Sequence, residues 1–490
     1  MAIYKHGTYG EFADSIGAVA TQGGTVAVYV GVAPVNLIRG YAASVNSPVK
    51  LTSMSDVQAL MGYSNNWGAF DLCEAFKVHF DNVSGNVGPI VAINVLDPAT
   101  HKKAEKTTTS VTFVNGRAAF ASETIILDTI AVANGVEGTD FSVSYDFARG
   151  QVVLYAIGDA LTGSVNVTYE EVDTTQVDKL TIIGKATDTG EYAGLGCINL
   201  IYQELNLIPS IVICPKWSET PDVYNAMIQA ATKINGHWDA VIYADIPILD
   251  GAAKVDTIAQ AIKWKGDNAY TNERSKVYWP KAKGTDGTTY HGSVLGAWRT
   301  MLVDASHDGV PMESPSNKGV PVVKQYFGDG STNRGFDQQQ ANKLNEDGIT
   351  TIVFHGAQWV LWGPHTAAYK HGAVIDNRSI FDSSIRMMMY VSNSFQKEHA
   401  LVIDGPMTRA MADTIRNREQ EKADALAAMG ALLGTPVVAF NRSDNSDADL
   451  VEGNFVWSFE SGTPTPPFKS GTLKVAYNTA GFDSYFGEVE

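Results

Sequence analysis

Residues 26–32 read VAVYVGV, an unbroken apolar run rich in β-branched side chains. A strand that is buried on both faces of a sheet has this composition, because neither face can carry polar side chains. Residues 90–96, IVAINVL, and residues 211–214, IVIC, repeat the pattern. Apolar side chains at helical spacing over residues 55–61 and 69–80 separate the first two runs. The alternation of strand and helix predicts an α/β core.

The rhythm of the sequence changes between Lys102 and Asp178, where short runs of Val, Thr and Tyr alternate with polar residues. Turn signals such as Asn115-Gly116 separate these runs at the spacing of β-hairpins. We therefore expect a small all-β domain over residues 102–180. It would be inserted into one α/β (α+β) core that is assembled from residues 25–101 and 181–471.

Further elements of the core follow from the same patterns. Ser55 is the expected N-cap of the first helix, and the Gly, Ser, Asn and Asp content of residues 280–340 predicts long surface loops. The remaining expectations are helices over residues 221–234 and 248–265, and strands over residues 240–244 and 350–354.

The clearest predicted helix runs from Met407 to Leu433, with Asp404 placed to cap it and Pro406 in its first turn. Gly434 is expected to end it. Its N-terminal half carries cations, which oppose the helix dipole there: Arg409, Arg416 and Arg418. One interpretation is local pairing of Arg409 and Arg416 with Asp413, three or four residues away.

Both ends of the chain are predicted to be extended arms. Residues 1–24 contain five glycines and little apolar periodicity. Residues 472–490 begin with the strand-like alternation of Thr472–Tyr477 and then lose any pattern. Neither segment has enough apolar side chains to pack on its own subunit.

Composition excludes several classes of protein. The 36 Lys and Arg against 53 Asp and Glu give a net charge of −17, which argues against a protein that coats nucleic acid. Three cysteines without a CxxC pair exclude a disulfide framework and argue against structural zinc. No secretory signal is visible, and the longest apolar stretch, residues 26–38, is too short to span a bilayer. We expect neither a metal, nor a cofactor, nor membrane insertion.

The sequence contains no GxSxG, Walker A, GxGxxG or HExxH motif. The best candidates for a hydrolase site are Ser293, His291 and Asp304, but no nucleophile elbow surrounds the serine. His365 and His371 do not have the spacing of metal ligands on a helix, and His307-Asp308 is expected to form a turn. We therefore predict that the protein is not an enzyme.

Four groups of segments, in this order, resemble the contractile tail sheath proteins of phages and phage-tail-like bacteriocins. They are residues 27–36 with 46–49; residues 196–215 with 238–247; residues 311–317 (PMESPSN) with 344–349 (LNEDGI); and residues 359–363 (WVLWG) with 381–390 (FDSSIRMMMY). The resemblance covers most of residues 26–480, while the β insertion matches only in kind.

The resemblance implies a structural subunit that forms a six-fold helical homopolymer around a tail tube and contracts to drive that tube through a cell envelope. It also implies contacts with tube, baseplate and tail terminator proteins, and none with nucleic acid. The place of action would be the tail of a virion or phage-tail-like particle, after synthesis in the bacterial host cytoplasm. The β insertion would lie on the outer surface.

In this family each terminal arm adds a strand to a sheet of a neighbouring subunit. On this sequence, the arm residues that would contact a neighbour are Ile3, Tyr4, Tyr9, Leu473, Val475 and Tyr477. The basic half-helix of Arg409, Arg416 and Arg418 becomes a candidate tube-facing surface. The alternatives are another assembly protein, of a capsid or baseplate, and the α/β hydrolase considered above.

Overall fold

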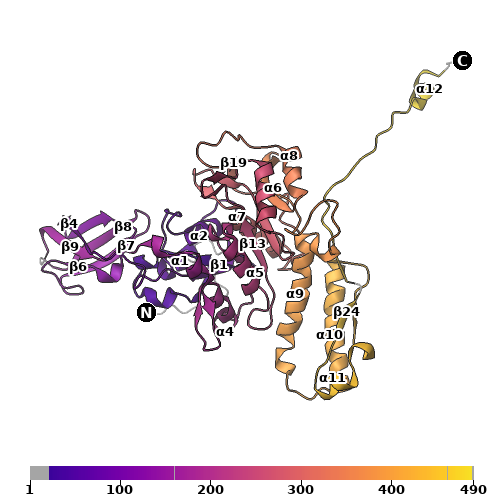
Figure 1. Cartoon of the computed structure of the whole chain (residues 1–490), viewed down its shortest axis with the longest axis horizontal. Coiled ribbons are helices and arrows are strands. Elements are labelled where there is room, and N and C mark those ends of the chain that lie inside the picture. The colour runs from indigo at the N-terminus through magenta and orange to yellow at the C-terminus, as the bar shows by residue number, and fades with distance from the viewer. Residues whose placement is uncertain (1–20, 159–160, 461, 488–490) are drawn as a thin grey trace, which may run out of the picture.

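The computed structural model describes residues 21–158, 161–460 and 462–487, and its centre is an eight-stranded sheet (Figure 1). Six neighbouring strands are parallel, and one antiparallel strand closes each edge. The spatial order is β2 (Pro48–Leu51), β3 (Val87–Asn94), β1 (Thr21–Gly31), β12 (Ile211–Ile213), β13 (Val241–Asp245), β16 (Ser275–Tyr278), β20 (Ile349–His355) and β21 (Gln358–Trp362). The sheet therefore joins strands from both sides of the β-rich segment, so the core is mixed α/β.

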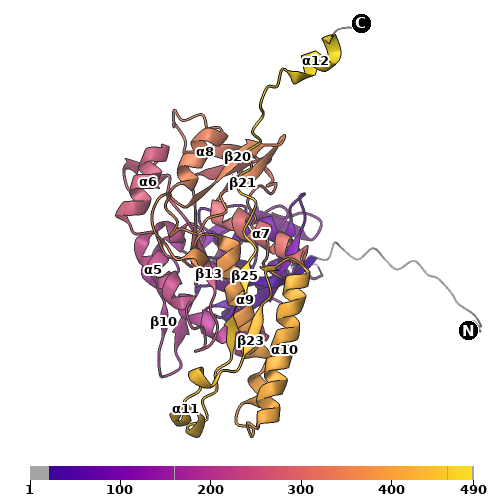
Figure 2. The ribbon, with the colours of Figure 1, turned by 90° about the vertical axis from the view of Figure 1, so that its right-hand side faces the viewer.

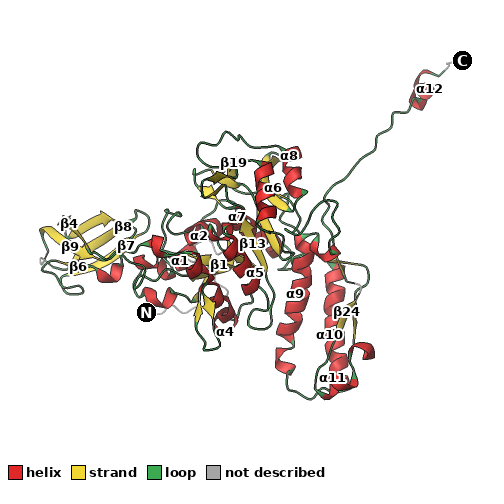
Figure 3. Ribbon diagram, in the orientation of Figure 1, coloured by secondary structure: helices red, strands yellow, loops and turns green. Residues whose placement is uncertain are grey.

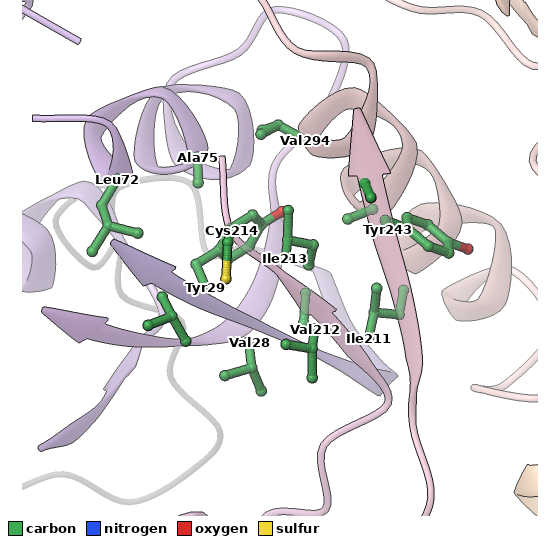
Figure 4. Packing of buried hydrophobic residues seen from close by; sticks show 14 of the residues in the cluster. Val28, Tyr29, Leu72, Ala75, Ile211, Val212, Ile213, Cys214, Tyr243 and Val294 are labelled. Carbon is green, nitrogen blue, oxygen red and sulfur yellow. The ribbon is translucent and has the colours of Figure 1, made fainter. Parts of the chain in front are cut away.

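The apolar runs form the inner strands of this sheet. Strand β1 lies between β3 and β12, and its residues 26–30 are buried. Val28 pairs with Val212 and Tyr29 with Ile213, and the two pairs point to opposite faces (Figure 4). β1 begins at Thr21, so the expected arm boundary at residue 24 is wrong for residues 21–24, which already run beside β3.

Helices cover both faces of the sheet. On one face, α2 (Leu72–Phe80) and α7 (Gly292–Ala305) contact each other and β1. The other face holds the 3₁₀ segment Gly194–Leu200 and α5 (Pro221–Ala230). Flanking elements are α1 (Met54–Leu60), α3 (Lys179–Ile183), α4 (Ile201–Leu205), α6 (Ile258–Asp267) and α8 (Gln338–Asn345), with the short strands β10 (Lys185–Ala186), β11 (Tyr192–Ala193), β14 (Leu249–Asp250), β15 (Ala253–Lys254), β17 (Lys281–Gly284), β18 (Thr289–Tyr290) and β19 (Val322–Tyr326).

Three details of the core differ from the sequence-based expectations. The N-cap of α1 is Ser53, which accepts a hydrogen bond from the backbone N–H of Asp56, and not Ser55. Residues 248–265 begin with the β14–β15 hairpin and only then enter α6. The third concerns α7, which is buried against the sheet inside residues 280–340, where we expected loops.

Strands β4 to β9 form a separate body at one end of the molecule's long axis (Figure 1). They are β4 (Thr107–Phe113), β5 (Arg117–Ala121), β6 (Ala131–Val132), β7 (Phe141–Asp146), β8 (Gln151–Ala156) and β9 (Gly163–Tyr169). Two three-stranded sheets, β4-β9-β6 and β5-β8-β7, enclose their own apolar cluster. Asn115 and Gly116 both have positive φ in the tight turn between β4 and β5, as their sequence indicated.

At the opposite end lie α9 (Asp382–Glu398) and α10 (Arg409–Ala428), side by side in both views (Figures 1 and 2). The predicted helix from Met407 to Leu433 is therefore too long at both ends. Thr408 is the N-cap, not Asp404, because its side chain accepts the N–H of Met411. After α10 come β22 (Leu432–Leu433), β23 (Val437–Ala439), α11 (Asp447–Val451), β24 (Ser458–Glu460) and β25 (Thr463–Pro464).

The chain leaves this helical part after β25 as an extended segment (Figure 3). Residues 472–477 have no strand partner within the described part of the chain, so the strand-like alternation forms no strand in the isolated subunit. A short helix follows, α12 (Ala480–Phe486), far from the core (Figure 1). No helix among the described residues is long and apolar enough to cross a membrane.

Candidate interaction surfaces

The last two of the four groups of segments that carry the family resemblance meet at one junction around Gly363. The Gly363 N–H donates to Ser316 Oγ at 3.0 Å, and the Asn317 N–H donates to the Leu361 carbonyl at 2.6 Å. Asn345 Nδ2 donates to the carbonyl of Trp362 at 3.0 Å. A Cβ atom at position 363 would lie 2.8 Å from Asn345 Nδ2, so only glycine fits this position without displacing its neighbours. The motif residues therefore build a structural joint.

The same joint holds the first turn of α9 through buried charge. Lys276 Nζ, on β16, donates to the Gly363 carbonyl at 2.9 Å and to Asp382 Oδ2 at 2.7 Å. One turn further along α9, Arg386 Nη1 donates to Asp304 Oδ2, on α7, at 2.5 Å. Lys276, Asp304, Asp382 and Arg386 are all buried.

Thr25 on β1 completes this network, because its Oγ1 donates to Asp304 Oδ2 at 2.6 Å. Burial raises the pKa of Asp304, and Arg386 and Thr25 oppose that rise. A buried charge is costly without a partner, so the network fixes where α9 leaves the sheet. The network could not be read from the sequence, because its four charged residues lie on three separate elements, β16, α7 and α9.

The predicted basic half-helix lies on the outside of α10. Arg409 and Arg418 are exposed, and Arg416 is partly exposed. Arg409 Nε lies 3.8 Å from Asp413 Oδ2, while Arg416 Nη2 donates to Asn417 Oδ1 at 2.9 Å. The local pairing expected with Asp413 is thus seen for Arg409 as a long, solvent-exposed contact, which contributes little to stability. This surface and the β4–β9 body lie at opposite ends of the molecule (Figure 1).

The predicted C-terminal arm residues Leu473, Val475 and Tyr477 are all exposed. These residues lie on one side of an extended segment, and residues 474 and 476 on its other side are exposed as well, so both sides face solvent. The predicted N-terminal arm residues Ile3, Tyr4 and Tyr9 lie outside the described residues.

Among the described residues, strand β24 of the helical part has an edge that pairs with no other strand. Strands β23 and β24 form a two-stranded antiparallel sheet. The outer side of β23 is covered by Gln420 of α10, whose Oε1 accepts the Val438 N–H at 2.8 Å and whose Nε2 donates to the Pro436 carbonyl at 2.9 Å. The open edge is therefore that of β24. A two-stranded sheet is only marginally stable by itself, so this edge suits the addition of another strand.

The hydrolase candidates do not form a catalytic triad. His291 Nδ1 is 2.6 Å from Glu74 Oε2, and Ser293 Oγ donates to Asp245, so the serine and histidine have different partners. Asp304 lies eleven positions beyond Ser293, near the other end of α7, in the ion-pair network. Ser293 is also fully buried.

Two further histidines that the sequence singled out, His365 and His307, serve packing and a turn. His365 is buried and stacks on Tyr369 with ring centroids 3.6 Å apart. His307 Nε2 is 2.8 Å from Glu313 Oε2, and Asp308 has the positive φ of the expected turn. Within residues 21–158, 161–460 and 462–487, no group of three or more His, Cys, Asp or Glu could hold a metal ion.

Comparison with known proteins supports the family that the motif segments resemble. The chain matches no protein-family profile. It is 25% identical over 460 residues to the tail sheath protein of Burkholderia phage BcepMu, covering 89% of each chain. It is 23% identical over 334 residues to a putative prophage major tail sheath protein of Pseudomonas aeruginosa strain UCBPP-PA14, covering 67% of this chain and 78% of that relative.

Solved structures with the same fold span almost the whole chain. One is a chain of the anti-feeding prophage baseplate, 6-fold symmetrised, with a TM-score of 0.55 and 13% identity over 98% of this chain and 100% of that one. Another is the contracted helical sheath of the anti-feeding prophage, with a TM-score of 0.53 and 14% identity over 96% of this chain and 98% of that one. These likenesses show the fold, and the sequence relatives confirm the predicted resemblance.

Proposed function

We propose that this chain belongs to the contractile tail sheath proteins and is the subunit that polymerises around a tail tube and shortens to drive it through a cell envelope. The observation that carries this is the extent of the likeness. The match to the BcepMu tail sheath protein covers 89% of this chain, and the fold of the contracted sheath subunit covers 96% of it. An assembly protein that shared only one domain with sheaths would not match in this way.

Several partners follow from this function. The subunit binds copies of itself in a six-fold helical polymer, the tail tube protein on the inside, and baseplate and terminator proteins at the two ends. It acts in the tail of a virion or phage-tail-like particle, after synthesis in the host cytoplasm. It has no catalytic role, does not bind nucleic acid directly and does not insert into membranes.

The C-terminal arm joins neighbouring subunits by strand addition. Its residues 472–477 alternate in a strand pattern but have no strand partner among the described residues, while β24 presents an open edge. Both features are explained if the arm of one copy pairs with β24 of the next. Main-chain hydrogen bonds then keep the subunits linked while their bodies rotate during contraction. The N-terminal arm has the same linking role.

The position of the basic half-helix supports a radial order for the subunit. The Arg409 side chain is 94% exposed. Helix α10, which carries it, lies on the opposite side of the central sheet from the β4–β9 body (Figure 1). In the proposed order, α10 faces the tube and the inserted β domain, residues 102–180, lies on the outer surface. Exposed charge contacts are weak and screened by salt, which suits an interface that must break during contraction.

Charge reversal tests the tube-facing surface. Arg409→Glu with Arg416→Glu should weaken assembly on tail tubes at low salt, while folding and tube-free polymerisation stay unchanged. Lys263→Glu is the matched control, because Lys263 is an exposed helical cation on α6 that pairs only with Asp267 four residues later. If wild type and the double variant assemble equally well on tubes at low salt, the arginines do not contact the tube and make only local pairs on α10.

Negative-stain electron microscopy of the purified chain tests the function itself. A sheath subunit should form striated tubes of uniform diameter. Closed shells would identify a capsid protein, and isolated rings or discs would identify a baseplate component. The baseplate component is the alternative because one structure with the same fold is a chain of a baseplate. Dispersed monomers at every concentration and salt condition would reject all three.

A further inference from the structure

Helix α12 at the end of the C-terminal arm carries an aromatic face that its own subunit does not cover. Phe482, Tyr485 and Phe486 are 52%, 85% and 75% exposed. Positions 482, 485 and 486 follow the i, i+3, i+4 spacing of one helix face, and the rings contact one another, with centroids 6.3 Å apart for Phe482 and Phe486 and 5.4 Å for Tyr485 and Phe486. Amphipathic helices that dock into grooves use anchors at this spacing.

The arm places this face away from the subunit that owns it. After Pro464 the chain continues through Pro466 and Pro467, which favour an extended backbone, and it runs outward until α12 (Figures 1 and 2). Exposed aromatic side chains of this size are the residues that most often dominate binding at protein interfaces. The arm therefore ends in an exposed aromatic face that is suited to bind another protein surface.

A matching surface borders the open edge of β24. The partly exposed rings of Phe440, Phe455 and Trp457 form a cluster, with the Trp457 ring centroid 5.3 Å from that of Phe440 and 6.4 Å from that of Phe455. Trp457 Nε1 donates to the Ala412 carbonyl at 3.2 Å, which fixes its ring against α10. Val456, between two of these rings, is exposed.

The lengths of the two segments agree. If the arm runs antiparallel along β24 with residues 474, 475 and 476 opposite Glu460, Phe459 and Ser458, Tyr477 lies beside the neighbouring Trp457. Helix α12 begins three residues after Tyr477, a reach of about 10 Å in an extended chain. The aromatic face of α12 thus arrives at the aromatic cluster without any further linker.

We infer that α12 is an aromatic anchor that docks on the Phe440, Phe455 and Trp457 cluster of a second copy of this chain. The inference rests on the proposed sheath function, because it takes the strand addition at β24 as given. It assigns to the arm a second contact: the strand fixes register through the backbone, and the anchor supplies apolar burial that a short strand lacks.

The first test measures assembly of the full-length chain. Phe482→Ala with Phe486→Ala should raise the concentration needed for tube formation about tenfold or more in sedimentation assays. Phe468→Ala is the matched control, because Phe468 is an exposed aromatic side chain of the same arm, upstream of the strand segment. Trp457→Leu should have a similar effect, and combining it with the arm variant should add little, as expected for residues that contact each other.

Deletion of residues 472–490 distinguishes a failure of the strand addition from a failure of the aromatic anchor. If the deletion assembles normally, the linking role in the proposed function fails. If the deletion blocks assembly but the Phe482/Phe486 variant assembles like wild type, the anchor is wrong and the strand addition stands.

Cross-linking identifies the occupant of the cluster. The native cysteines Cys73, Cys197 and Cys214 are buried, so Tyr485→Cys and Val456→Cys provide the accessible thiols. Mixing the two single variants should give cross-linked dimers on oxidation. Cross-links that form only inside a chain that carries both substitutions would show that α12 folds back on its own subunit, and would overturn the inference.

Discussion

Replacing Arg386 with Met tests how the helical part is fixed to the sheet. Asp304 is fully buried, and its Oδ2 has two partners, Arg386 Nη1 and Thr25 Oγ1. Removing the guanidinium leaves the buried carboxylate with a single neutral donor. Breaking a buried ion pair from one side costs about 3–5 kcal/mol. At about 1.4 kcal/mol for each factor of ten, local opening should become roughly a hundred to several thousand times more frequent.

Hydrogen exchange followed by mass spectrometry is the appropriate assay, since a chain of 490 residues with several bodies does not unfold in one step. Protection should fall in α9 and in β1, which the network joins, and should stay unchanged in strands β4–β9. Arg378→Met is the control: that guanidinium is 57% exposed and pairs with Asp376 at 3.0 Å, so its loss should cost less than about 1 kcal/mol.

The double variant Arg386→Met with Asp304→Asn sharpens the result. It leaves no uncompensated charge, so it should be less damaging than Arg386→Met alone, because a buried pair replaced on both sides costs little. If Arg386→Met lowers protection in α9 by less than tenfold, the ion pair with Asp304 does not fix this helix to the sheet. The same conclusion follows if the double variant is at least as damaging as the single one.

Three further predictions concern other parts of the molecule. Removing residues 1–20 or residues 472–490 should leave a folded, soluble subunit that forms no long tubes; contractile tubes of normal length after either deletion would disprove the linking role. Replacing residues 102–178 with a short Gly/Ser linker should spare assembly, and collapse of the remaining α/β core, seen by circular dichroism, would show that the boundaries are wrong. Burial alone would lower the pKa of His291, but the Glu74 carboxylate raises it to about 10. The stabilisation from His291 is therefore complete below pH 6.5 and is lost as pH rises towards 10. His291→Gln should reduce the fall in the hydrogen-exchange protection factors of α7, which begins next to it, between pH 6.5 and 9.5; an unchanged fall would contradict this.

Several inner strands of the central sheet were predictable, because they are apolar on both faces. Residues 26–32, 90–96 and 211–214 therefore stood out with no other information. The arm residues Leu473, Val475 and Tyr477 were also predicted to lack a place on their own subunit, and they are exposed. Their contact with a neighbour stays a prediction, as does the tube-facing role of the arginines.

Helix α7 was missed because glycine weakens helical patterns and suggests loops. A side chain at either Gly292 or Gly296 would overlap the ring of Tyr278, so the glycines allow the helix to pack closely on the sheet. Helix α9 was missed for a different reason. Its first turns bury Asp382, Ser383 and Arg386 instead of an apolar stripe, and that choice depends on partners far away in the sequence.

The aromatic helix α12 could not be predicted either, because Gly481 lies inside it, Gly487 ends it, and its rings are exposed in the subunit. The open edge of β24 could not be predicted either. It is the free edge of its sheet because Gln420, on another segment, covers the outer side of β23. Interfaces of this kind follow from tertiary placement, whereas local periodicity reports only whether a segment is buried in its own chain.

A helical reconstruction from electron micrographs of the assembled chain would show the radial placement of the subunit and its arm contacts together. We expect a six-fold tube in which α10 lines the lumen, strands β4–β9 lie on the outer surface, and residues 472–477 of one copy pair with β24 of another. A tube with the β4–β9 body facing the lumen, or with both arms folded back on their own subunits, would contradict this arrangement.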